Sequence, residues 1–274
     1  KKEIDCLIDE NITVKCNQAL GSSFTIDELF EKGYQAILLA MGAHQSKPLR
    51  LDGEDSEGVI PSIEFLKKYN LKGELGARGK VGVIGGGNSA IDAARMSLRL
   101  KDVEEVEILY RRTRDEMPAF AEEVEAADQE GIDIKTLVSP VKIITENGHI
   151  TGLECIKNRL GDVDKSGRRR PVPIPGTEHI ISFDTLIVAI GEDSGVDCIG
   201  PAQSSGIETT KYGTVDVNTG TLLTNRDGVF AAGDLVTGPN TVVQAIAAGK
   251  KASVMMLRYL KNESLEQPVE INLP

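Results

Sequence analysis

The residues with the most distinctive chemical potential form a glycine-rich turn. Residues 83–92 read Val-Ile-Gly-Gly-Gly-Asn-Ser-Ala-Ile-Asp, which spaces Gly85, Gly87 and Ala90 as G-x-G-x-x-A. In a dinucleotide-binding turn the first glycine permits a tight turn, the second lets the backbone approach a pyrophosphate, and a small third residue lets helix and strand pack closely. The pyrophosphate then lies at a helix N-terminus, where free N–H groups and the helix dipole favour negative charge. Glycine-rich turns also occur at ordinary sharp corners. The secondary structure predicted on either side of the turn therefore has to distinguish a nucleotide-binding turn from an ordinary one.

The elements on either side of the turn support nucleotide binding. The apolar residues before the turn predict a strand, the apolar periodicity of residues 90–100 predicts a helix, and residues 103–110 predict a second strand with an apolar end. Strand, glycine turn, helix and strand make up the first βαβ unit of a Rossmann domain.

The type of nucleotide is indicated by the residues after the second predicted strand. NAD-binding domains usually carry Asp or Glu there for the ribose 2′-OH, but this chain has Arg111, Arg112 and Arg114. Guanidinium groups bind a 2′-phosphate through charge-assisted hydrogen bonds, which favours NADP(H) over NAD(H). Arg111 lies 26 residues after Gly85 (111 − 85), against about 20 for the usual ribose-reading position. A solvated basic loop is the alternative interpretation.

Composition is that of an α/β enzyme or a part of one. The chain has 274 residues, of which 40% are hydrophobic and 28 are glycine, and this length suits two domains. Its formal net charge of −11 argues against nucleic acid and anionic membranes as partners. We find neither the roughly 18 continuous apolar residues of a membrane span nor a signal-peptide core, so we expect a cytoplasmic protein. The basic run from Lys165 to Arg170, followed by prolines, predicts a solvated hairpin tip.

Other catalytic chemistries find little support. The four cysteines (Cys6, Cys16, Cys155 and Cys198) form neither a redox C-x-x-C pair nor a metal or iron–sulfur ligand run. We therefore expect reduced, structural cysteines and no dithiol mechanism. The three histidines are scattered and there is no G-x-S-x-G sequence, so hydrolase and zinc-enzyme mechanisms are not indicated.

A second nucleotide domain is suggested by two segments of the chain that resemble each other. Residues 36–42 and 186–191 are both apolar strand-like segments that end in A-x-G, although the chain has only one glycine-rich turn. A further predicted strand ends at Gly233 and Asp234, and a helix of small residues begins near Thr241. A carboxylate at the end of a strand can bind cofactor hydroxyls, and a helix N-terminus can face an electron-rich ring. Taken alone, these segments also fit an ordinary core strand and core helix.

Together these motifs resemble the small (beta) subunit of NADPH-dependent glutamate synthase and related FAD/NAD(P)-linked oxidoreductases. The resemblance is carried in order by residues 83–96, 108–119, 187–192 and 224–252. It implies the α/β, two-dinucleotide-binding-domain flavoprotein fold, with a Rossmann-like NADP(H) domain inserted into a truncated FAD domain. The implied NADP(H) domain is residues 78–192, the partial FAD domain is 1–77 with 193–265, and residues 266–274 form a tail.

The resemblance also implies roles for individual residues. For NADP(H), these are Gly85, Gly87, Asn88 and Ser89 at the pyrophosphate, Arg111, Arg112 and Arg114 at the 2′-phosphate, and Gly191 and Glu192 beside the nicotinamide. For FAD, these are Gly233 and Asp234 near the ribityl or pyrophosphate region, and Thr241, Val242 and Val243 near the flavin ring. Met41 departs from the family, which usually has Thr at that strand end. Because hydride transfer needs positioning rather than an acid–base group, no catalytic side chain is expected.

The resemblance places the start of this chain inside the family's FAD domain. We therefore expect a C-terminal portion of a longer protein, without the iron–sulfur domain and the FAD glycine-rich turn. The favoured function is the NADPH-oxidising electron-input module of a glutamate-synthase-like flavoprotein, working with a large subunit or another electron-accepting partner. The alternatives are a related flavoprotein with another acceptor (transhydrogenase, pyrimidine-reducing or sulfide-linked), and a non-catalytic nucleotide-binding fragment. An uncovered apolar edge also makes a homo-oligomer a reasonable hypothesis.

Overall fold

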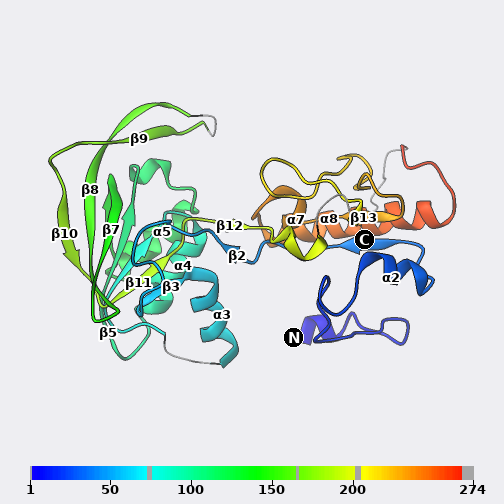
Figure 1. Ribbon diagram of the computed structural model, residues 1–274, viewed down its shortest axis with the longest axis horizontal. Helices are drawn as coiled ribbons and strands as arrows, with labels where there is room; N and C mark the ends of the chain where they lie inside the picture. The colour runs from blue at the N-terminus through cyan, green and yellow to red at the C-terminus, as the bar shows by residue number, and fades with distance from the viewer. Residues whose placement is uncertain (1, 73–75, 165–166, 201–204, 267–274) are drawn as a thin grey trace. The chain divides into compact units, whose positions relative to one another are not determined.

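The computed structural model describes residues 2–72, 76–164, 167–200 and 205–266 (Figure 1). The chain divides into two compact units. Unit 1 contains residues 1–43 and 194–274, and unit 2 contains residues 44–193.

The centre of unit 2 is a parallel five-stranded sheet with the order β3-β11-β4-β5-β6. The strands are β3 (Val59–Pro61), β11 (Thr185–Val188), β4 (Gly79–Ile84), β5 (Val103–Tyr110) and β6 (Asp133–Thr136). Helix α4 (Asn88–Ser97) connects β4 to β5. The predicted strand, glycine turn, helix and strand are therefore confirmed as secondary structure.

Helices cover one face of this sheet. They are α3 (Ser62–Lys72), α4 and α5 (Ala121–Gln129), and the 3-10 turn η1 (Arg114–Glu116) precedes α5. Alternate residues of β4, including Val81 and Val83, point into a core shared with buried residues of α4 such as Ile91. The small residues Ala90, Ala93 and Ala94 are fully buried, which brings α4 close to the sheet.

An antiparallel sheet covers the opposite face. Its strands are β7 (Val138–Glu146), β8 (His149–Val163), β9 (Arg169–Pro173) and β10 (His179–Ser182), and β8 pairs with each of the other three. Phe183 packs so closely that a Cβ on Gly82 would lie 2.9 Å from its ring. Lys165 and Ser166, part of the predicted hairpin tip, lie outside the described residues.

A buried ionic cluster lies on this second face. Glu107 of β5 is 2% exposed, and its Oε1 is 2.8 Å from the Nζ atoms of both Lys80 and Lys135. Burial acts to raise the pKa of Glu107, but the hydrogen bonds from Lys135 and Lys80 outweigh it and hold that pKa below its usual value. For the neighbouring Cys155 thiol burial dominates, and it raises the pKa to about 12.

Unit 1 contains a parallel pair of short strands and several helices. Strand β1 (Ile37–Leu39) pairs with β13 (Val229–Ala231), and the helical elements are α1 (Lys2–Asp5), α2 (Ile26–Glu31), η2 (Val196–Ile199), α7 (Asp234–Thr237) and α8 (Val242–Leu260). The core includes Ile37, Leu39, Val229, Ala231 and Leu235. Within the described residues, none of the helices combines the length and apolarity needed to cross a bilayer.

The boundary between the units differs from the predicted one. Residues 44–77, which we expected in the first domain, belong to unit 2. The reason is that β3 pairs with β11, in register from Val59 and Leu186 onward, and that α3 packs against α4. In unit 2, β2 (Gln45–Ser46) also pairs with β12 (Glu192–Asp193). The segment where the chain enters this unit and the segment where it leaves are therefore paired as two short antiparallel strands.

Candidate functional site

The glycines of the predicted nucleotide turn have different physical requirements. Gly85 has φ +150°, and a Cβ there would lie 2.2 Å from the carbonyl oxygen of Ala189. A Cβ on Gly86 would lie 2.5 Å from the ring of Tyr110. For Gly87, by contrast, the nearest atom to such a Cβ is Cγ of Pro118, at 3.9 Å. The fold therefore requires the first two glycines, while the third leaves open space beside its backbone.

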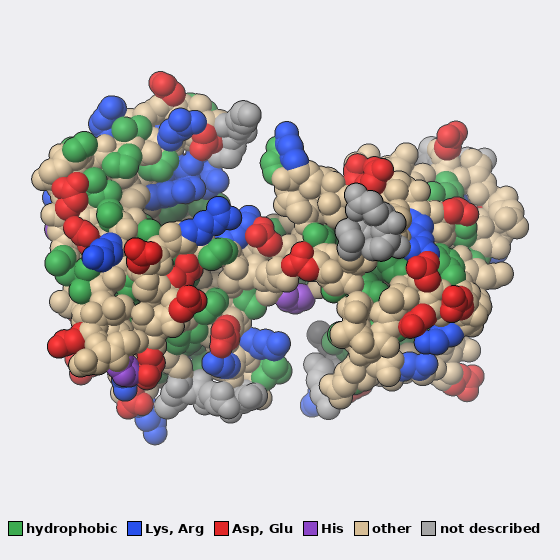
Figure 2. Space-filling model, viewed as in Figure 1, with side chains coloured by type: hydrophobic (Ala, Val, Ile, Leu, Met, Phe, Trp, Pro, Cys, Tyr) green, Lys and Arg blue, Asp and Glu red, His purple; other side chains and the backbone are tan. Residues whose placement is uncertain are grey.

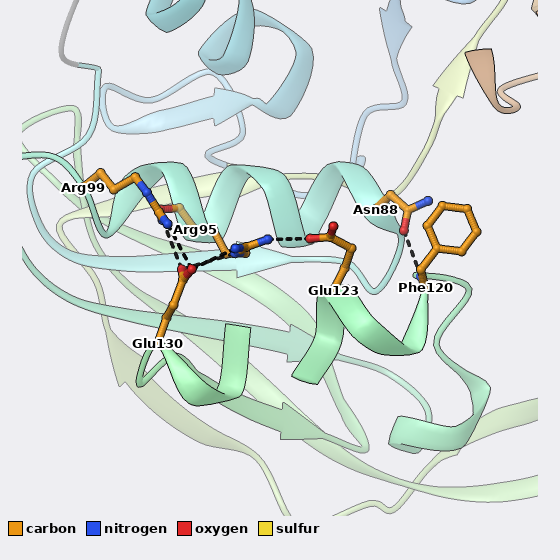
Figure 3. Close-up of polar contacts among 6 residues, drawn as sticks. All are labelled: Asn88, Arg95, Arg99, Phe120, Glu123 and Glu130. Atoms are coloured by element: carbon orange, nitrogen blue, oxygen red, sulfur yellow. Dashed lines mark hydrogen bonds and ion pairs between the residues drawn. The ribbon is translucent and has the colours of Figure 1, made fainter. Parts of the chain in front are cut away.

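The open glycine is the N-cap of α4. Gly87 has extended backbone angles and provides no side-chain cap, so the first N–H groups of the helix lack the usual acceptor from the N-cap residue. The exposed Asn88 side chain turns toward α5, and its Oδ1 accepts a hydrogen bond from the backbone N–H of Phe120 at 2.9 Å (Figure 3). Ser89 is half-buried in the same turn. The helix N-terminus thus combines uncapped donors with a positive dipole end, an arrangement that suits an anion.

Ion pairs fix α4 against α5. Arg95 bonds Glu123 and Glu130, and Arg99 also bonds Glu130 (Figure 3). The hydrogen bonds from Arg95 and Arg99 lower the pKa of the Glu130 carboxyl to about 2. The helix that presents the uncapped N–H groups is therefore held in place along its length.

The three predicted phosphate-binding arginines do not converge. Arg111 is exposed, and its backbone oxygen accepts a hydrogen bond from Nδ2 of Asn158 at 3.1 Å. Arg112 is 3% exposed; its Nε donates to the carbonyl of Arg169 at 2.7 Å. Arg114 turns toward α5, with its Nη2 3.3 Å from Oδ2 of Asp128. Of the three, Arg111 therefore has the side chain available to a ligand.

The surroundings of Arg111 favour an anion. Desolvation by the neighbouring protein, followed by the charges of Arg112 and Arg168, lowers the pKa of Arg111 below its ordinary value. A nearby negative charge would relieve this repulsion between like charges. Figure 2 shows basic side chains gathered on unit 2 beneath the β8–β9 hairpin, although the chain as a whole is acidic.

Sequence reasoning missed the position of this hairpin. The basic run was predicted to form a solvated turn, but Arg169 donates from both its backbone N and its Nε to Oε1 of Glu116, at 3.0 and 3.2 Å. The contact joins residues 53 positions apart, so local sequence carries no signal for it. The only hint was that both segments are rich in arginine.

The predicted nicotinamide-side residues lie at β12. Gly191 has φ +125°, and its carbonyl accepts a hydrogen bond from the backbone N of Lys47 at 2.9 Å. Glu192 is 9% exposed, and its Oε1 is buried without a hydrogen-bond partner among the described residues. Ser46, its register partner on β2, also has a buried Oγ with none in that part of the chain. A buried acceptor of this kind is costly unless a donor binds it.

The predicted FAD residues lie in unit 1, around two helix starts. Gly233 has φ +70° and precedes the half-buried Asp234, whose backbone oxygen accepts a hydrogen bond from Oγ of Ser194 at 3.1 Å. Thr241 caps α8 by accepting from the backbone N of Gln244 at 3.3 Å. The side chains of Val242 and Val243 are both 75% exposed. The first turn of α8 therefore presents apolar side chains together with helix-terminal N–H groups.

Comparisons with known proteins agree with this architecture. Residues 2–249 match the family model described as pyridine nucleotide-disulphide oxidoreductase. Mycobacterium tuberculosis FprA in complex with NADPH is similar in structure with a TM-score of 0.72, 19% identity, and coverage of 89% of this chain and 67% of that chain. The two-dinucleotide-binding-domain flavoprotein fold is thereby confirmed.

Several curated proteins are similar in sequence. The beta subunit of the NADP(+)-dependent formate dehydrogenase of Moorella thermoacetica is 40% identical, covering 99% of this chain and 38% of that protein. The beta subunit of the NADPH-Fe(3+) oxidoreductase of Geobacter sulfurreducens is 36% identical, covering 100% and 45%. The small chain of the NADPH glutamate synthase of Azospirillum brasilense is 31% identical, covering 99% and 58%. The resemblance seen in the sequence is confirmed, and the chain spans between 38% and 58% of these relatives.

Proposed function

Because the chain belongs to the pyridine nucleotide-disulphide oxidoreductase family, we propose that it is the NADPH-oxidising electron-input module of a longer flavoprotein. In such a module, bound FAD would accept a hydride from NADPH, and the electrons would then pass to a partner. The residues of this chain bind and orient the two groups, a task that requires positioning rather than acid–base chemistry. The observation that carries the proposal is the turn at Gly87, where open space, uncapped N–H groups and a helix dipole coincide.

The turn fits a dinucleotide pyrophosphate. Gly85 keeps the turn tight, Gly87 permits close approach, and the backbone N–H groups of Asn88 and Ser89 lie at the start of α4, where a helix binds anions. The Asn88 side chain contributes by holding the loop at Phe120 beside the turn. We therefore assign phosphate binding to the backbone N–H groups, and positioning of the loop to the side chain of Asn88.

Selectivity for NADP(H) is assigned to Arg111. It follows β5 directly, its side chain is exposed, and the positive charges around it favour a phosphate dianion. Arg112 helps to position the neighbouring Arg111, since the Arg112 guanidinium is buried and bonded to Asp164 and to the backbone of Arg169. We infer that Arg114 has little role, because it bonds Asp128 on α5.

Glu192 fits the nicotinamide end. Its buried Oε1, which has no hydrogen-bond partner among the described residues, is an acceptor, and a nicotinamide carries a carboxamide N–H₂ group that can donate to it. Gly191 precedes it with a positive φ, which turns the chain after β11. This pair lies at the carboxyl end of the parallel sheet, where ligands of open α/β sheets bind.

Unit 1 fits part of an FAD site. Asp234 follows β13 and can bind hydroxyls, while Val242 and Val243 offer exposed apolar surface beside helix-terminal N–H groups. The side chains of these two adjacent valines are each 75% exposed, which is unfavourable in water. A planar ring that packs on them would cover this apolar surface. The single glycine-rich turn of the sequence lies in unit 2, and we assign it to the pyrophosphate of NADP(H) rather than to that of FAD.

The electron acceptor is another subunit rather than a dithiol of this chain. The four cysteines form no C-x-x-C pair in the sequence, and burial of Cys155 keeps its thiol protonated by raising its pKa to about 12. The three relatives are beta or small subunits of a formate dehydrogenase, an Fe(3+) oxidoreductase and a glutamate synthase. A large glutamate-synthase-type subunit is one candidate partner. The 40% identity to the formate dehydrogenase subunit favours a second, in which the same module serves another acceptor.

Titration calorimetry of the chain and its variants with NADP⁺ and NAD⁺ tests the proposal. We expect wild type to prefer NADP⁺, and Arg111→Ala to weaken NADP⁺ by about 1.5–3 kcal/mol while leaving NAD⁺ unchanged, the value of a hydrogen bond to a charged group. Arg114→Ala is the matched control and should change neither. Equal losses for both nucleotides, or no NADP⁺ preference in wild type, would contradict the assignment.

A further inference from the structure

The β8–β9 hairpin is docked onto the turn that follows β5. Arg112 donates from Nε to the carbonyl of Arg169 at 2.7 Å and from Nη2 to Oδ2 of Asp164, also at 2.7 Å. Glu116 accepts from the backbone N and the Nε of Arg169. The hairpin is therefore anchored at both of its strands, by contacts between residues at least 52 positions apart in the chain.

Arg168 lies between these anchors. Its carbonyl accepts a hydrogen bond from the backbone N of Asp164 at 2.7 Å, and it directly precedes Arg169. Its side chain is half-buried. Near the base of the same hairpin, Asn158 binds the backbone oxygen of Arg111 at 3.1 Å. The hairpin is thus held on the residue proposed to read the 2′-phosphate, and Arg168 is close enough for its charge to act on that residue.

The charges in this region are not equivalent. Arg112 pairs with Asp164, and Arg169 with Glu116, so both guanidinium groups hold the hairpin in place. Desolvation lowers the pKa of Arg111, and the positive charge of Arg168, together with that of Arg112, contributes to lowering it, so that like charges lie near Arg111. Two neighbouring guanidinium groups match a phosphate dianion, which accepts several charge-assisted hydrogen bonds and removes the repulsion.

We propose that Arg168, carried by the β8–β9 hairpin, is a second 2′-phosphate-binding residue beside Arg111 and contributes to selection of NADP(H). This inference rests on the proposed function of the glycine turn. It assigns a ligand contact to a residue 57 positions beyond Arg111 (168 − 111), in a segment whose sequence predicts only a solvated turn.

The experiment compares Arg168→Ala with Arg159→Ala in the full chain. Arg159 is the matched control because it is an exposed arginine of the same hairpin, and it follows Asn158, so its side chain points to the opposite face of the strand. The probes are 2′,5′-ADP, NADP⁺ and NAD⁺, titrated by calorimetry. We expect Arg168→Ala to weaken 2′,5′-ADP and NADP⁺ about tenfold, the lower end for a hydrogen bond to a charged group, and NAD⁺ not at all.

A conservative variant separates ligand binding from folding. Arg168→Lys keeps a cation and should recover most of the NADP⁺ affinity, whereas a role that depends on the planar guanidinium within the fold would not be recovered. Unfolding midpoints of all variants are measured alongside. Arg168→Ala behaving like Arg159→Ala, while Arg111→Ala loses NADP⁺ preference, would overturn this inference and leave the proposed function intact. Unchanged selectivity in Arg111→Ala would instead contradict the proposed function.

Discussion

Alanine substitutions in the glycine turn separate a requirement of the fold from a requirement of the ligand. In Gly85→Ala the new Cβ would meet the carbonyl oxygen of Ala189 at 2.2 Å, on a backbone with φ +150°. Overpacking costs about 1–3 kcal/mol and a positive φ with a Cβ about 1–2 kcal/mol. We therefore expect Gly85→Ala to destabilise unit 2 by about 2–5 kcal/mol.

Gly87→Ala should behave differently. Its φ of −90° suits alanine, and the nearest atom to the new Cβ is 3.9 Å away. Reduced freedom of the unfolded chain stabilises by about 0.4–1 kcal/mol, and alanine is a poorer N-cap than glycine by a comparable amount. The net change in stability should stay within about 1 kcal/mol. The methyl group nevertheless occupies the space through which a phosphate oxygen approaches the backbone N–H groups, so NADP⁺ affinity should fall at least tenfold, about 1.4 kcal/mol or more.

The assay pairs urea unfolding followed by circular dichroism with calorimetric titration of NADP⁺. Gly85→Ala is expected to lower the urea midpoint strongly, and Gly87→Ala to keep the wild-type midpoint while losing affinity. A folded Gly87→Ala variant that binds NADP⁺ as tightly as wild type would show that the pyrophosphate does not lie at this turn. A Gly85→Ala variant of unchanged stability would refute the packing argument.

Three further predictions concern the stability and reactivity of individual groups. Glu107→Gln should destabilise by about 2 kcal/mol in urea unfolding, because its two lysine partners lose a buried counter-ion, whereas the half-exposed Glu105→Gln should have little effect. Glu130 has a folded pKa of about 2 against its usual 4.5, so its ion pairs stabilise above pH 4.5 and are lost toward pH 2; the thermal midpoint of Glu130→Gln should lie below wild type at pH 7 and approach it on acidification. A thiol reagent should label exposed Cys6 at once but Cys155 only after unfolding, since burial keeps Cys155 protonated; rapid labelling of Cys155 in the folded chain would contradict this.

Local patterns in the sequence were sufficient for the core of unit 2. The strand, glycine turn and helix follow from apolar periodicity and from the G-x-G-x-x-A spacing, and the structure shows that two of these glycines, Gly85 and Gly86, have neighbours too close for a Cβ. The boundary at residue 44 was not predictable in this way. It depends on pairing of Val59 in β3 with Leu186 in β11, and a three-residue strand carries almost no periodic signal.

The arginines after β5 carry a local signal that distinguishes their roles. Tyr110 is buried, Arg111 exposed and Arg112 buried, which is the alternation of an extended chain. Period-two reasoning could therefore have separated the exposed arginine, Arg111, from the buried one, Arg112. By contrast, the docking of Arg169 on Glu116 joins segments far apart in the chain, and no local rule predicts it.

The acidic composition of the chain and a site for a phosphorylated nucleotide are compatible because screening makes the site local. At physiological ionic strength the Debye length is about 8 Å, so a net charge of −11 spread over the surface acts weakly on a phosphate held between nearby guanidinium groups. What matters is how the charges near the site are arranged, and here the carboxylates of Asp164 and Glu116 are matched to Arg112 and Arg169. These two acids thereby hold the hairpin in place beside Arg111. Under the proposed assignment, selectivity for NADP(H) depends on these contacts within the protein as well as on Arg111, the residue that we propose to bind the 2′-phosphate.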